Sequence, residues 1–101
     1  MKLNLPKRIS LLSYLPKEGK FETLIVIKDI KNKIEITQDE ITEYEIKSVE
    51  NSIFWNDAGA TSEIEVAFTE LEKLEISKTL KKLSEEEKLR MEDVELYEMF
   101  V

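Results

Sequence analysis

The sequence predicts an α+β fold, in which a small three-stranded antiparallel sheet of about residues 44–68 is flanked by N-terminal and C-terminal helices. Apolar residues recur at helical spacing on both sides of this stretch. Within it, Ile64, Val66 and Phe68 alternate with Glu63, Glu65 and Ala67, as they do in a half-buried strand. At 101 residues, the chain is expected to form one domain, residues 1–101.

Two helices are expected at the start of the chain. Pro6 suits a first helical turn, and Pro16 and Gly19 end the apolar stripe that follows it. A second element runs from Phe21 to about Lys33, where Leu24, Ile27, Ile30 and Ile34 recur at helical spacing. Helix is the favoured interpretation, but the run from Leu24 to Ile27 also has strand character, so both remain open.

The middle of the chain begins with a helix-start signal. Thr37 and Glu40 match a capping box, which predicts a short helix of about residues 38–43. Strands are then expected from Tyr44 to Val49 and from Ser52 to Trp55, joined by a two-residue turn at Glu50 and Asn51. Residues 56–59 have turn composition and precede the third strand.

A second capping box, Thr69 and Glu72, begins the C-terminal part. It predicts a helix of about residues 69–87, a bend near Leu89 and Met91, and a last helix of about residues 92–100. Leu71 and Leu74 lie off the main apolar stripe, which predicts that another element covers the first turn.

Composition excludes most reactive sites. The chain has no cysteine or histidine, so the common nucleophile–base pairs and most transition-metal sites are absent. Its two glycines do not suffice for a phosphate loop or a dinucleotide fingerprint. Carboxylates such as Asp39 and Glu43 are typical of solvated helix faces, and the acidic runs lack calcium-loop spacing. We therefore expect no enzyme activity, no catalytic residue, no metal and no cofactor.

Charge is distributed unevenly along the chain. Residues 1–33 carry eight basic and three acidic residues, a net of +5, whereas residues 34–101 carry seven and nineteen, a net of −12. The simplest interpretation is that basic N-terminal helices dock on an acidic remainder. The alternative is a charged surface intended for a partner. No segment approaches the length of a membrane span, and the N-terminal apolar run is interrupted by Pro16, so we expect a cytoplasmic protein.

The predicted order of three helices and a hairpin is also that of some winged-helix DNA-binding proteins. The candidate recognition helix, about residues 38–43, holds three acidic residues and no basic one. Phosphate contacts require lysine and arginine, so we do not expect this helix to bind nucleic acid.

The only tryptophan lies in the centre of the chain. Adjacent strand residues point to opposite faces, so one of Phe54 and Trp55 is expected in the core and the other partly exposed. We take Phe54, Trp55, Asn56 and Asp57 as the candidate interaction surface.

Three segments carry a family resemblance: residues 3–19, which open with Leu3-Asn4-Leu5, residues 53–56, Ile-Phe-Trp-Asn, and residues 80–100, which end in Leu96-Tyr97-Glu98-Met99-Phe100. In these the chain resembles small uncharacterised proteins encoded by bacteriophages and prophages. The resemblance implies a phage context, hence a bacterial host cytoplasm, and transfers no functional residue.

Three function classes follow in order of preference. The first is a non-enzymatic phage accessory or structural protein that acts through protein–protein contact, with a homo-oligomer as one form of that contact. The second is an acidic inhibitor that mimics nucleic acid and occupies a host nuclease or defence complex, motivated by the −12 balance of residues 34–101. The third is a winged-helix-like DNA-binding regulator.

Overall fold

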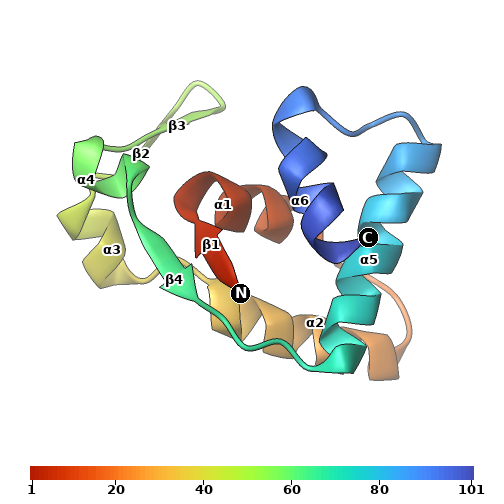
Figure 1. The fold of residues 1–101 in the computed structure, drawn as a ribbon. Coiled ribbons are helices and arrows are strands. Elements are labelled where there is room, and N and C mark those ends of the chain that lie inside the picture. The colour runs from red at the N-terminus through yellow and green to blue at the C-terminus, as the bar shows by residue number, and fades with distance from the viewer.

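The N-terminal strand pairs with a strand from the middle of the chain (Figure 1). In this computed structural model, which describes residues 1–101, β1 (Lys2–Asn4) lies antiparallel to β4 (Glu63–Glu65), with Leu3 opposite Ile64. The amino group of Met1 lies 2.6 Å from Glu65 Oε1, and the Val66 N–H donates to the Met1 carbonyl at 2.8 Å. Leu3 is fully buried beneath this pairing.

Helices form most of the remainder. They are α1 (Leu5–Tyr14), α2 (Phe21–Ile34), α3 (Gln38–Glu43), α4 (Asp57–Ala60), α5 (Glu70–Glu85) and α6 (Val94–Phe100), with a 3₁₀ turn, η1 (Met91–Asp93), before the last. Both predicted capping boxes are present, at Thr37 with Glu40 and at Thr69 with Glu72. Asn4 caps α1, because its side chain accepts from the Lys7 N–H at 3.0 Å. None of these helices combines the length and the apolar character that a membrane span requires.

The hydrophobic core lies among α1, α2, α5 and α6. Residues 21–34 are helical, which decides between the two interpretations left open for this segment. Ile27 is buried and Ile25 is exposed, whereas a strand would place both side chains on the same face. The exposed Leu71 and Leu74 show that the prediction of a covered first turn in α5 is wrong, since α5 packs through the face that carries Ile76 and Leu80. Eleven buried side chains form the core: Leu3, Leu11, Leu15, Ile27, Ile30, Ile34, Val66, Phe68, Ile76, Leu80 and Leu96.

The predicted α+β class is confirmed, but the predicted single three-stranded sheet is wrong. Residues 44–68 contain a separate two-stranded hairpin, β2 (Lys47–Val49) with β3 (Ser52–Phe54), and β4 pairs with β1 instead. The reason is local: residues 56–59, expected to be a turn, begin the short helix α4, which leads the chain away from the hairpin. The inward face predicted for Val66 and Phe68 is confirmed.

The hairpin projects from the globule and adds nothing to its core (Figure 1). Its turn is the predicted Glu50-Asn51 pair, with φ of 48° and 68°, the positive values that a two-residue turn of this kind requires. All six residues of β2 and β3 are exposed. Core stability therefore does not depend on the hairpin side chains.

The interior holds one complete ion pair, between Arg8 of α1 and Glu40 of α3. Arg8 is 2% exposed and binds both Glu40 carboxylate oxygens, at 2.5 and 2.9 Å. The same guanidinium donates to the carbonyl oxygens of Ile34 at 3.1 Å and Glu35 at 2.7 Å, at the end of α2. Hydrogen bonds from Arg8, opposed by burial and assisted by Thr37, lower the pKa of Glu40 to about 2.

A second partly buried pair joins α2 to α5. Lys33 Nζ lies 2.5 Å from Glu72 Oε1 and 3.0 Å from the Ala67 carbonyl oxygen. Burial raises the pKa of Glu72, but hydrogen bonds from Lys33 and the Thr69 N–H outweigh it, so the net direction is downward. Four of the seven ion pairs join residues 1–33 to the acidic remainder, as the simplest interpretation of the charge distribution predicts.

Glu40→Gln should destabilise the protein at pH 7 by about 3 kcal/mol, because it leaves a buried guanidinium without a counter-charge. The folded-state pKa of Glu40 is lowered, so its stabilisation is complete above the unfolded-state pKa, near 4.5, and is lost as the pH falls toward about 2. Urea unfolding of wild type and variant across this range checks the prediction. Glu43→Gln on the same helix is the control, and a difference between wild type and Glu40→Gln that is independent of pH would contradict it.

Leu3→Ala should cost about 3 kcal/mol, because it removes a fully buried side chain from beneath the β1–β4 pairing. Val49→Ala in the hairpin should change the free energy of unfolding by less than about 0.5 kcal/mol. Chemical denaturation of both variants compares them directly. Equal losses would mean that the hairpin belongs to the cooperative core.

Candidate interaction site

The four residues of the predicted interaction surface have different environments. Phe54 ends β3 and is 56% exposed, and Asp57, the first residue of α4, is also exposed. Asn56 is partly buried and structural, since its Oδ1 accepts from the Gly59 N–H at 2.9 Å and its Nδ2 donates to the Glu43 carbonyl at 3.0 Å. The structure therefore leaves Phe54 and Asp57 freely accessible.

Trp55 is partly buried at the base of the hairpin. It packs closely over the buried Gly59, where an added Cβ would lie 3.1 Å from the Trp55 Cβ and 3.0 Å from the Tyr44 Cβ. The absence of a side chain at Gly59 thus allows Trp55 and Tyr44 to approach α4. The expectation that one residue of the Phe54–Trp55 pair lies in the core is wrong, because Phe54 is exposed and the partly buried Trp55 lies outside the core cluster.

Two further exposed apolar residues accompany Phe54 on the hairpin. Val49 is 53% exposed and Ile53 is 41% exposed. Sequence reasoning missed both as surface residues, because it assigned the hairpin to a buried sheet. The signal in the sequence was the two-residue turn, which makes Val49 and Ser52 partners in a two-stranded hairpin. No third strand follows that hairpin directly in the chain.

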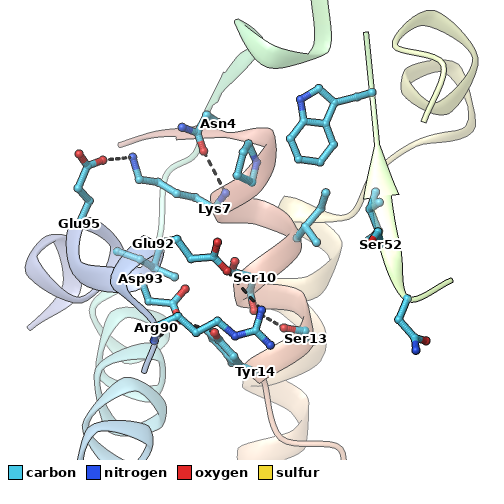
Figure 2. A pocket seen from close by; sticks show the side chains of 16 residues that line it. Asn4, Lys7, Ser10, Ser13, Tyr14, Ser52, Arg90, Glu92, Asp93 and Glu95 are labelled. Carbon is cyan, nitrogen blue, oxygen red and sulfur yellow. Dashed lines mark hydrogen bonds and ion pairs between the residues drawn. The ribbon is translucent and has the colours of Figure 1, made fainter. Parts of the chain in front are cut away.

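A cleft of about 480 Å³ lies beside the hairpin (Figure 2). Helix α1 forms its floor, with Ser10 and Ser13 between the two walls. One wall is β3 with Ser52, and the other is the η1–α6 segment with Asp93 and Glu95. The lining is mainly polar. Sequence reasoning missed this cleft because its residues come from three segments that are distant in the chain.

Charged side chains bridge and line the cleft. Lys7 Nζ lies 3.0 Å from Glu95 Oε2, and Arg90 Nη1 lies 3.3 Å from Glu92 Oε1. Asp93 is 1% exposed and takes part in none of the ion pairs. Its Oδ2 accepts from the Tyr14 hydroxyl and from the Arg90 N–H, whereas its buried Oδ1 has no hydrogen-bond partner.

Two hydroxyl groups of this cleft are held in local hydrogen bonds. Burial, together with the hydrogen bond to Asp93 and the charge of that carboxylate, raises the pKa of Tyr14 to about 12, which makes its phenol a poor acid near neutral pH. Ser13 donates its hydroxyl to the Ser10 carbonyl at 2.7 Å, so it is not paired with a base. No three carboxylates gather in a group that could hold a metal ion.

No family model, curated protein or solved structure matches this chain.

Tyr14→Phe should destabilise the protein by about 1–2 kcal/mol near neutral pH, because Asp93 Oδ2 loses a hydrogen-bond donor. The raised pKa means that the Tyr14 contribution is complete below its unfolded-state value of 10.0 and is lost as the pH rises through about 12. Denaturant unfolding at several pH values should therefore show the difference from wild type shrinking above pH 10. Tyr97→Phe is the control, and a constant difference would be inconsistent with the Tyr14–Asp93 bond.

Proposed function

We propose that this chain is a non-enzymatic phage or prophage protein of the bacterial host cytoplasm, and that it acts through protein–protein contact at the β2–β3 hairpin. The observation that carries the proposal is the hairpin itself. It contributes no buried residue, yet it holds the apolar side chains Val49, Ile53 and Phe54 at the surface.

Physical reasoning supports a contact role for these side chains. Apolar side chains that lie together on a projecting element are unfavourably exposed to water, and a partner that covers them removes this cost. Aromatic anchors also contribute much of the energy of protein interfaces. The side chains of β2 and β3 are exposed and do not pack in the core, so core packing does not restrict which contact residues they can be. A second copy of the chain is one such partner, which makes a homo-oligomer part of this proposal.

The double variant Val49→Ser/Phe54→Ser should remain folded and lose partner binding by at least about tenfold, since two exposed apolar contacts are removed. Affinity capture from phage-infected cells, followed by titration of the captured protein, measures this loss, and light scattering reports self-association. Phe21→Ser is the matched control, because Phe21 is 74% exposed at the start of α2, away from the hairpin (Figure 1). Equal binding by the double variant and wild type would reject the hairpin as the contact surface.

The acidic nucleic-acid mimic is the second candidate. It is favoured by the net charge of −12 over residues 34–101, most of whose carboxylates remain exposed after the ion pairs to the N-terminal helices are counted. Its partner would be a basic host protein, and binding would weaken steeply with salt. A DNA-binding regulator has less support, because α3 presents the exposed acids Asp39 and Glu43 and no basic residue.

A further inference from the structure

We propose that the cleft between β3 and the η1–α6 segment binds an extended peptide segment of a partner protein, rich in basic side chains, which adds as a strand to the free edge of β3. This inference rests on the proposed contact function and specifies the chemistry of the partner. The binding mode is β-strand addition, in which backbone hydrogen bonds provide affinity and the walls of the groove provide selectivity.

The free edge follows from the register of the hairpin. The two-residue turn closes on Val49 and Ser52, which form a hydrogen-bonded pair. Bonded and non-bonded pairs alternate along an antiparallel ladder, so the next pair, Ser48 and Ile53, points its N–H and C=O groups away from the partner strand. The Ile53 backbone groups therefore face outward on the side opposite β2.

This outward side faces the cleft. Within β3, both Ser52 and Ile53 line the cleft, whereas no residue of β2 does. Adjacent strand residues point to opposite faces, so lining by both of them indicates that the edge of β3 faces the opening. An unpaired strand edge is a template for another extended chain, and here α1 provides a floor beneath it.

The cleft has the volume of a ligand pocket. At about 480 Å³ it lies within the range of about 300–1,000 Å³ that is usual for small-molecule and cofactor sites. Its apolar lining includes Ile53, Trp55 and Leu96, which suits the side chains of an extended segment that point down toward α1.

Charge selects a basic segment. The wall opposite β3 carries Glu92, Asp93 and Glu95, while the cationic lining residues Lys7 and Arg90 are already paired with Glu95 and Glu92. Asp93 has no cationic partner, so the lining as a whole carries one excess negative charge. An acidic segment would meet exposed carboxylates and find no free cation, whereas lysine or arginine side chains would meet a favourable potential.

The direct test uses a defined probe. The basic probe is a pool of labelled octapeptides in which Lys or Arg alternates with Thr or Val, and the control pool replaces the basic residues with Glu. Fluorescence anisotropy should show binding of the basic pool, weakening at least about threefold from 50 to 500 mM salt, and no binding of the acidic pool. Amide hydrogen exchange at Ile53 should slow at least about tenfold on binding. Equal binding of both pools, or unchanged exchange at Ile53, would overturn the inference.

Matched proline variants separate the edge from the fold. Proline is tolerated at edge positions whose N–H is not bonded within the sheet, so both Ile53→Pro and its cross-strand counterpart Ser48→Pro should keep the hairpin. Ile53→Pro should weaken peptide binding at least about tenfold, because one backbone hydrogen bond and the approach along β3 are lost. Ser48→Pro changes the opposite edge and should bind as wild type does, and Ile53→Val should also bind, because its N–H remains.

Three outcomes distinguish this inference from the proposed function. If Ser48→Pro loses binding as strongly as Ile53→Pro, the edge of β3 is not the site. If the free protein dimerises and Ile53 exchange is already slow without peptide, a second copy occupies the edge and the basic-peptide inference is wrong. If capture from infected cells depends on Val49 and Phe54 but not on the Ile53→Pro change, the contact function stands and the cleft inference fails.

Discussion

The buried guanidinium of Arg8 is the constraint on which the rest of the structure depends. It joins three elements: α1, which carries it, the end of α2, whose carbonyl groups it satisfies, and α3, whose first-turn carboxylate balances its charge. The planar fork of arginine can serve a carboxylate and two carbonyl groups at once, whereas lysine presents a single point charge. The direction of the chain after α2 therefore depends on one side chain from the opening helix.

Glu40 has two structural roles because of this arrangement. It accepts from the Thr37 N–H in the capping box and also neutralises Arg8. A capping carboxylate normally lies at a solvated helix end, where its contribution is modest. Here the cap is joined to a charge inside the protein, so the start of α3 and the packing of α1 are coupled.

Features with local causes could be predicted from the sequence. The capping boxes at Thr37 and Thr69 and the turn at Glu50 and Asn51 are set by residues within four positions of one another, and each was predicted. The β1–β4 pairing was not, because three residues carry too little alternation to reveal a partner far along the chain. In the sequence alone, Arg8 likewise resembles any basic residue at the surface, because its burial becomes clear only when the position of Glu40 is known. The cleft was missed for the same reason, since no local pattern unites α1, β3 and Asp93.

The β1–β4 pairing also has a consequence for the order in which the chain folds. The amino group of Met1 contacts Glu65, 64 positions later, so the first strand has no sheet partner until residues 63–65 have been synthesised. Until then Leu3 has no β4 to pack beneath, and α1 can be formed but not enclosed. Contacts that close so long a loop incur their entropic cost before they stabilise the fold. Formation of the β1–β4 pairing is thus expected late in folding, in contrast to the hairpin, which is assembled from neighbouring residues.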